Sequence, residues 1–262
     1  MKKRCLFLSI ICFSLFMGGC AKKEARLPPG EHGPFAANED TTSIEKSEVP
    51  MLCKVIGIWD EAALVANLED EHGLYQVSLD ALAQDTSQIK PGDKVEIGFD
   101  GLVLEIYPPI IANPDYIKLV ENGDNLVGVY HGILQDLLEK DAGLNADIHF
   151  IAVDLSKDKL LTESEKNALI YLLGNHTQIE TRQGSCESLL SENLIIQDAN
   201  TGFSHLEAGL LLLLETSQLD KDSFHFTAEK WRSSLGAYTL YDCLAKKENG
   251  SCSYEIGAEM IS

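Results

Sequence analysis

An alternation of apolar and polar residues begins near Met51 and constrains the fold more than any other feature of the sequence. A period of two matches the alternating faces of a β-strand and does not match a helix. The alternating segments are 52–58, 64–68, 75–79, 95–99 and 102–107. The Asp100-Gly101 pair between the last two segments is a strong hairpin signal. Five short strands in about 60 residues predict a small five-stranded β-barrel, OB-like in shape, over residues 51–120.

The spacing changes at Asn125, where apolar residues begin to recur every three or four positions. This spacing predicts an amphipathic helix that ends at Gly143 and a second helix over 162–173. Strands are expected at 148–155, 178–181, 195–197, 209–215, 224–231, 237–243 and 252–256, with a short helix at 187–191. Residues 121–262 are therefore expected to form an α+β domain, with helices first and an antiparallel meander after them.

The first residues have the pattern of an export signal. A basic start at Lys2, Lys3 and Arg4 precedes an apolar run over 5–17, and small residues follow before Cys20. This arrangement predicts a secretory signal peptide over residues 1–19. The apolar run is too short to cross a bilayer as a stable helix. The open alternative is an ordinary secretory signal followed by an incidental cysteine.

The sequence Met17-Gly18-Gly19-Cys20 resembles the lipobox of bacterial lipoproteins. The resemblance implies cleavage before Cys20 and attachment of lipid, such as palmitate, to that cysteine. It also implies an exported protein held at the outer face of the cell membrane, or at the outer membrane if the host is Gram-negative. Two or more acyl chains make such an anchor stable.

Residues 20–50 have the composition of a linker. They include Pro28, Pro29, Gly30 and Pro34, followed by a run of small polar residues. A flexible chain of this length spans roughly 30 Å root-mean-square. We expect this segment to tether the folded part of the protein to the lipid on Cys20.

The chain is strongly acidic, with a formal net charge of −20. Loss of residues 1–19 removes Lys2, Lys3 and Arg4 and no acidic residue, so the mature chain carries −23. Nucleic acid and anionic lipid both repel such a protein, and we expect no nucleic-acid partner. A well-hydrated exported protein is the simpler interpretation of the charge.

The cysteines that remain after the signal and the anchor are Cys53, Cys186, Cys243 and Cys252. They contain no Cys-x-x-Cys pair, which argues against a zinc ribbon or a thioredoxin-like site. Cys243 and Cys252 flank a turn sequence between two expected strands, so a disulfide between them is a hypothesis. It closes a loop of about ten residues, worth roughly 2.5–3 kcal/mol. Two buried thiols are the alternative, and Cys53 can pair with Cys186 only if their domains touch.

One segment has the spacing of an EF-hand calcium loop. Oxygen-bearing side chains occupy its positions 1, 3, 5, 9 and 12, which are Asp154, Ser156, Asp158, Thr162 and Glu165. Lys159 stands where the sharp turn of that loop requires glycine. The alternative interpretation is a strand exit followed by a helix cap, in which Thr162 and Glu165 form a capping box. We expect the cap, and we expect neither a metal nor a cofactor.

The most distinctive stretch of the second domain is residues 230–238. Trp231 lies between the cations of Lys230 and Arg232, with Tyr238 nearby, so these four side chains are a candidate binding face through cation–π contacts. The alternative is a core tryptophan on a strand, flanked by charges that point outward.

The stretches 134–145, 151–156, 161–166 and 230–238 together resemble a poorly characterised extracellular domain of Gram-positive bacteria. They also resemble the outer region of some membrane metallopeptidases of the antibiotic-sensor type. The resemblance covers residues 125–262 and includes the end at 260–262. It implies a shared exported module without established catalytic residues. The zinc motif His-Glu-x-x-His of those peptidases is absent here, so protease activity is not implied.

The sequence contains no catalytic motif that we recognise. It lacks a Gly-x-Ser-x-Gly elbow, a phosphate-binding glycine loop and a dinucleotide fingerprint. We therefore expect a non-enzymatic surface lipoprotein that binds or senses an unknown protein or small molecule. A hydrolase of envelope or extracellular polymers remains an alternative, because a catalytic set can assemble from distant residues. A structural envelope protein is the third interpretation.

Overall fold

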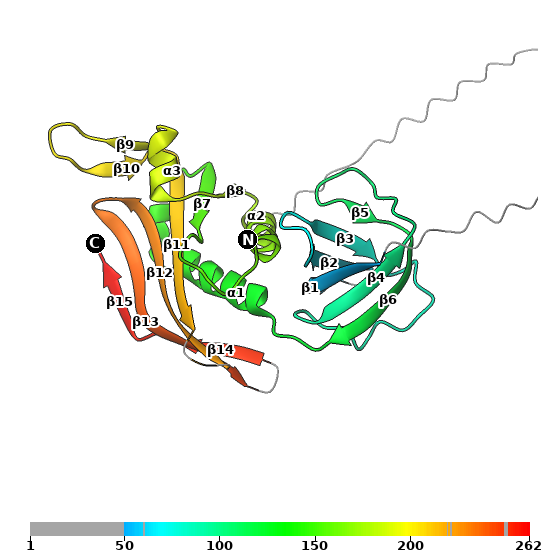
Figure 1. Cartoon of the computed structure of the whole chain (residues 1–262). Coiled ribbons are helices and arrows are strands. Elements are labelled where there is room, and N and C mark those ends of the chain that lie inside the picture. The colour runs from blue at the N-terminus through cyan, green and yellow to red at the C-terminus, as the bar shows by residue number, and fades with distance from the viewer. Residues whose placement is uncertain (1–49, 60, 219, 221, 249–250) are drawn as a thin grey trace, which may run out of the picture. The chain divides into compact units, whose positions relative to one another are not determined.

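A computed structural model describes residues 50–59, 61–218, 220, 222–248 and 251–262 (Figure 1). The expected signal peptide, Cys20 and the tether up to residue 49 lie outside the described residues. The described chain is α+β and is dominated by two β-sheets. None of the helices in these ranges is long and apolar enough to span a membrane.

The first sheet has six strands in the order β5-β3-β2-β1-β4-β6. Its strands are β1 (Met51–Trp59), β2 (Ala62–Asn67), β3 (Leu74–Ser78), β4 (Lys94–Phe99), β5 (Ile110–Ile111) and β6 (Pro114–Glu121). The predicted OB-like barrel of five strands is not confirmed, because no ladder in the described residues joins the end strands β5 and β6.

The strand expected at 102–107 is also wrong. In the structure this segment is irregular, and Leu104 forms only an isolated bridge with Ile110. The physical reason is competition for a partner, because β6 already occupies the free edge of β4, with Ile97 opposite Ile117. A strand without a neighbour leaves its backbone groups unpaired and is not stable alone.

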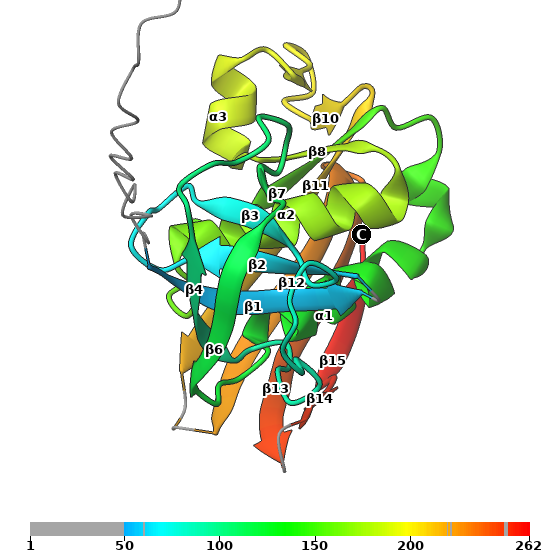
Figure 2. The ribbon, with the colours of Figure 1, turned by 90° about the vertical axis from the view of Figure 1, so that its right-hand side faces the viewer.

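Both faces of the six-stranded sheet are buried, as the alternation on β1 shows. Cys53 and Val55 point into a core that the sheet forms with its own loops, including Ile89. Ile56 and Leu64 belong to a second core that contains residues of the helices. In Figure 2 this sheet faces the viewer, and the helices α1 and α2 lie behind it.

The second sheet has nine strands, six of which follow the order β14-β13-β12-β11-β7-β8. The strands are β7 (Phe150–Asp154), β8 (Glu180–Gln183), β9 (Ile195–Gln197), β10 (Ser204–Leu206), β11 (Gly209–Gln218), β12 (Ser223–Ser233), β13 (Gly236–Glu248), β14 (Ser251–Glu255) and β15 (Ala258–Ile261). The expected antiparallel meander is present in β11 to β14, whereas β7 and β8 pair in parallel.

The helices are α1 (Leu126–Glu139), η1 (Ala142–Asn145), α2 (Glu163–Thr177) and α3 (Cys186–Ser191). The apolar face of α1, with Tyr130, Ile133 and Leu137, is fully buried against the sheet that contains β11 and β12. We call this side of the nine-stranded sheet the inner face. Figure 1 shows α1 and α2 between the two sheets.

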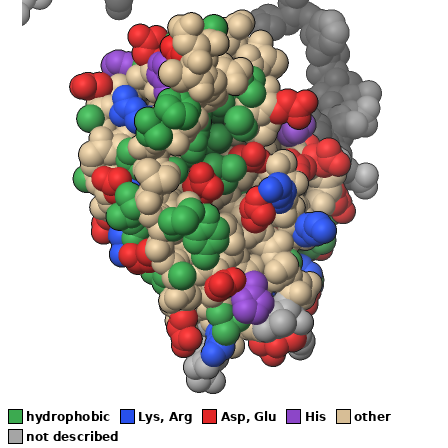
Figure 3. All heavy atoms as spheres, turned by 90° about the vertical axis from the view of Figure 1, so that its left-hand side faces the viewer, with side chains coloured by type: hydrophobic (Ala, Val, Ile, Leu, Met, Phe, Trp, Pro, Cys, Tyr) green, Lys and Arg blue, Asp and Glu red, His purple; other side chains and the backbone are tan. Residues whose placement is uncertain are grey.

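The opposite side of the nine-stranded sheet, the outer face, is only partly covered. A small cluster with Leu189 of α3 and Ile195 of β9 packs on Leu211 and Trp231 at one end of it. Toward the other end the outer face is open, and Figure 3 shows hydrophobic side chains interspersed with acidic ones there.

Candidate functional site

The loop between β7 and α2 is held in place by a buried carboxylate. Asp158 is 6% exposed, and its Oδ1 accepts hydrogen bonds from the Tyr130 hydroxyl at 2.6 Å and from the Thr216 hydroxyl at 2.7 Å. The backbone N–H of Leu161 donates to Oδ2 at 3.0 Å. These bonds satisfy a carboxylate that would be costly to bury unpaired, so the role of Asp158 is to fix the loop.

The helix cap predicted at the end of this loop is confirmed. Thr162 is the N-cap of α2, and its hydroxyl accepts the N–H of Glu165 while the Glu165 carboxylate accepts the N–H of Thr162 at 2.9 Å. The carboxylate of Asp154, by contrast, accepts the N–H of Ser156 in the preceding exposed turn. No group of three or more potential metal-ligating side chains gathers within the described part of the chain. Among the candidate calcium ligands, Thr162 and Glu165 thus form the helix cap, and Asp158 binds Tyr130 of α1 and Thr216 of β11.

The candidate binding face at 230–238 does not assemble. Lys230 is completely buried on the inner face, where its ammonium donates to the carbonyls of Leu138 and Asp141 and to Asn145 Oδ1 at 3.1–3.2 Å. The physical reason is the strand period of two, which places Lys230 under the carbonyl end of α1. There the cation satisfies backbone acceptors that the helix itself leaves free. Burial lowers the pKa of Lys230 to about 8.

The other members of that face are separated from one another. Arg232 binds the carbonyls of Leu144 and Ala146 on the inner face. Trp231 points to the outer face, where it is partly buried against the cluster under α3. The alternative of a core tryptophan with outward-pointing charges is therefore wrong about the faces, because the neighbouring cations lie on the inner face. The Tyr238 hydroxyl donates to the Glu259 carboxylate at 2.5 Å.

The structure does not join Cys243 to Cys252, because both thiols are free. The register does not place the two cysteines opposite each other: Cys252 lies opposite Lys247 on β13, and Cys243 lies opposite Phe226 on β12. Cys53 and Cys186 are free as well.

A hollow of about 540 Å³ lies where the open end of the outer face meets the β7–α2 loop. We call it the polar hollow. It is lined by Ser156, Lys157, Lys159, Glu215, Thr216, Ser217, His225, Phe226, Thr227 and Asp242. The parallel pairing of β7 with β11 brings the loop beside Glu215, because Leu213 is the partner of Asp154. The volume falls in the range of about 300–1,000 Å³ that is typical of small-molecule sites.

A bulge in β13 places Asp242 at this hollow. Phe226 pairs with Cys243 and Ala228 with Leu240, so one residue of β12, Thr227, faces two of β13, Tyr241 and Asp242. Asp242 has a φ of +50°, in the left-handed region. Such a conformation costs an L-residue free energy and persists where the surrounding structure requires it. Bulges of this kind re-aim a side chain, and they are frequent beside functional sites.

Three charged or titratable groups of the polar hollow are available for a ligand. Lys157 pairs with Glu215. Lys159, His225 and Asp242 make no side-chain hydrogen bond or ion pair with the residues that the structure describes. A cation, an imidazole and a carboxylate thus line one hollow beside the hydroxyls of Ser156 and Thr227. The hollow therefore offers a positively charged donor, a negatively charged acceptor and neutral groups that can donate or accept.

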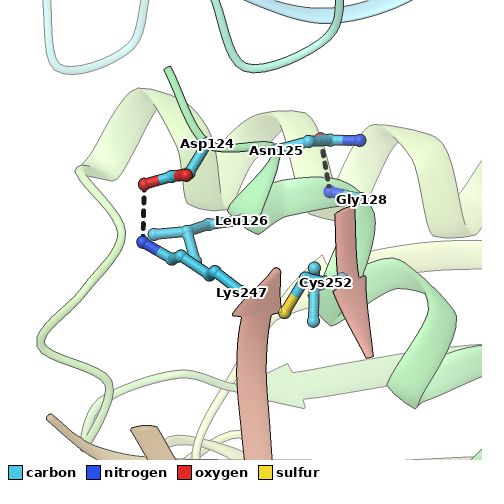
Figure 4. Close-up of a pocket in the computed structure, with 7 residues that line it drawn as sticks. Asp124, Asn125, Leu126, Gly128, Lys247 and Cys252 are labelled. Carbon is cyan, nitrogen blue, oxygen red and sulfur yellow. Dashed lines mark hydrogen bonds and ion pairs between the residues drawn. The ribbon is translucent and has the colours of Figure 1, made fainter. Parts of the chain in front are cut away.

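A second hollow, of about 340 Å³, lies at the start of α1 and contrasts with the first (Figure 4). Its charged groups bind each other, with Lys247 Nζ 2.6 Å from Asp124 Oδ2. Asn125, the N-cap of α1, accepts the N–H of Gly128 at 2.9 Å. Because these polar groups are already satisfied within the chain, we place the candidate site in the polar hollow.

Sequence reasoning did not find this site. Asp242 and His225 stand on neighbouring strands, and only the register and the bulge of β13 bring them to one hollow. The outward position of His225 was available as a signal, since it alternates with the apolar Phe224 and Phe226.

Comparisons of the chain with known proteins found no related protein or structure: no protein-family model, curated protein or solved structure matches it.

Proposed function

We propose that this chain is an exported, lipid-anchored protein that binds a small polar molecule in the polar hollow. The observation that carries the binding role is the set of free groups there, Lys159, His225 and Asp242, in a hollow of about 540 Å³. The anchoring rests on the lipobox-like sequence before Cys20. The resemblance of residues 125–262 to an exported module supports the same placement.

The chemistry of the lining defines the ligand class. The ammonium of Lys159 suits an anionic or carbonyl group, and the carboxylate of Asp242 suits an amino or hydroxyl group. Ser156 and Thr227 add hydroxyls that can donate or accept. A molecule that presents both kinds of group at once, such as an amino acid, a short peptide or an amino sugar, uses all of them.

Thermal melting of the mature protein with a fixed panel of amino acids, dipeptides, monosaccharides and amino sugars tests the proposal. A ligand at 100 times its Kd stabilises a protein by about 2.7 kcal/mol, which is visible as a rise in Tm. We expect a rise with at least one class of compound, and loss of that rise in Lys159→Ala and in Asp242→Asn. The control is Lys246→Ala, an exposed lysine on β13 outside the hollow.

Two outcomes contradict the binding role. In the first, no member of the panel raises the Tm of the wild-type protein. In the second, a rise occurs and persists in both Lys159→Ala and Asp242→Asn, which locates the ligand elsewhere.

A further inference from the structure

A short loop of the six-stranded sheet exposes an unusual density of apolar side chains. Leu102, Leu104, Ile106 and Tyr107 are 75%, 54%, 58% and 70% exposed, and they lie within six consecutive positions. We call residues 102–107 the apolar loop. Exposed apolar residues that occur singly are normal, but a contiguous group marks a surface that binds something.

The apolar loop is attached to the six-stranded sheet by packing and by backbone hydrogen bonds. Val103 packs on the core of the six-stranded sheet, and Pro108 is buried. The backbone N–H of Leu104 donates to the carbonyl of Ile110 at 2.8 Å, and the N–H of Ile110 donates back at 3.1 Å. These contacts fix the loop on the sheet, and the Tyr107 ring also meets the Tyr171 ring of α2 edge-to-face at 5.9 Å. Leu102, Leu104 and Ile106 remain exposed.

The register places the apolar loop at the end of the sheet where the chain enters it. Strands β1 and β4 are antiparallel, with Met51 opposite Ile97 and Lys54 opposite Lys94. The last residues of β4 therefore run past Met51, and the apolar loop follows directly after them. Met51, where β1 begins, thus lies at the end of the sheet from which the apolar loop starts.

We propose that the apolar loop docks onto the surface of the bilayer that holds the lipid of Cys20. This inference rests on the anchoring in the proposed function. Leucine and isoleucine side chains partition into the boundary between headgroups and acyl chains, and tyrosine is favoured at that depth. A flexible tether of thirty residues has a root-mean-square end-to-end distance of roughly 30 Å. Such a tether raises the effective concentration of the bilayer at the loop, so even weak intrinsic insertion suffices.

The charges around the loop determine which lipid headgroups favour docking. Asp100 and Glu105 are exposed in and beside it, and the mature chain is strongly acidic. Anionic headgroups repel these carboxylates, whereas zwitterionic headgroups do not. The loop therefore docks more weakly as the fraction of anionic lipid rises.

Tryptophan quenching in reconstituted vesicles tests the docking. The full mature lipoprotein is placed in phosphatidylcholine vesicles that contain lipids brominated near the headgroup boundary. Leu104→Trp is compared with Leu235→Trp, a matched control because Leu235 is 70% exposed in the turn between β12 and β13. We expect quenching at Leu104→Trp at least about twofold greater than at Leu235→Trp, since insertion reaches about 5–10 Å into the boundary.

Each result separates the docking from the anchoring. Flotation of the protein with the vesicles reports the anchor, and a protein that does not float contradicts both proposals. A floating protein with equal quenching at the two positions contradicts the docking alone. A blue shift of the Leu104→Trp emission that depends on protein density and not on brominated lipid assigns the loop to a second copy of the chain, which also overturns the proposal.

Discussion

Lys54 of β1 and Glu165 of α2 form an ion pair that joins the six-stranded sheet to the helices, with Lys54 Nζ 2.6 Å from Glu165 Oε1. Their side chains are only 14% and 4% exposed. The other carboxylate oxygen of Glu165 accepts the N–H of Thr162 in the capping box. The Glu165 carboxylate therefore completes the cap of α2 and also neutralises the Lys54 ammonium of the six-stranded sheet.

Glu165→Gln is expected to lower the free energy of unfolding by about 3–5 kcal/mol, because it leaves the Lys54 ammonium buried without a counter-charge. The double variant Lys54→Met, Glu165→Gln recovers part of that loss. Urea unfolding measures all three proteins. The exposed pair of Lys94 and Glu121 is the control, and Lys94→Met is expected to change stability by less than about 1 kcal/mol. Equal losses in Glu165→Gln and Lys94→Met would contradict this role.

Thr162→Ala is expected to cost about 1 kcal/mol, since it removes the N-cap hydroxyl that accepts the N–H of Glu165. The loss should be the same with a chelator and with millimolar calcium. Thermal melting in both buffers checks it. A wild-type Tm that climbs by several degrees in calcium, with the climb lost in Asp154→Ala, would show that the segment is a calcium loop after all.

Most of the confirmed predictions rest on sequence patterns that lie within one helix or strand. The spacing of Thr162 and Glu165 identifies the start of α2 without knowledge of the rest of the chain, and the structure confirms the cap. The apolar spacing after Asn125 likewise predicts α1, which spans Leu126–Glu139. Both signals lie within a single helix and its cap, so they can be read without knowing the register of distant segments.

The unsuccessful predictions depend on contacts between distant residues. The segment 102–107 has the period of a strand, but β6 takes the edge that it needs. Lys230 has the sequence context of a surface cation, and only its position under the end of α1 makes it a buried donor. The polar hollow requires the register of β12 with β13, which no single segment encodes.

Acidification is expected to destabilise the protein through His131. Burial and the neighbouring His176, whose ring centre is 5.8 Å away, lower the pKa of His131. The unfolded chain then binds the proton more readily, so this contribution is full above about pH 6.5 and is lost as the pH falls toward the folded pKa, at about 1.4 kcal/mol per unit of difference. Urea unfolding at pH 7 and pH 5 should show a smaller drop in His131→Gln than in the wild type. An identical drop in both would contradict the assignment.

Asp242→Gly is expected to be more stable than Asp242→Ala by about 1 kcal/mol, because the φ of +50° favours glycine over a residue with a Cβ. Both variants lack the carboxylate at the polar hollow, and both should lose ligand binding. Paired urea unfolding measures the difference. Equal stability of the two variants would show that the backbone at the bulge relaxes freely.

We propose that lipid on Cys20 holds this protein at a membrane. Metabolic labelling with radioactive palmitate, followed by membrane fractionation, tests it most directly in wild type and Cys20→Ala. We expect label and membrane association in the wild type, and loss of both, or accumulation of the uncleaved precursor, in Cys20→Ala. Equal palmitate labelling of the two proteins would contradict the account.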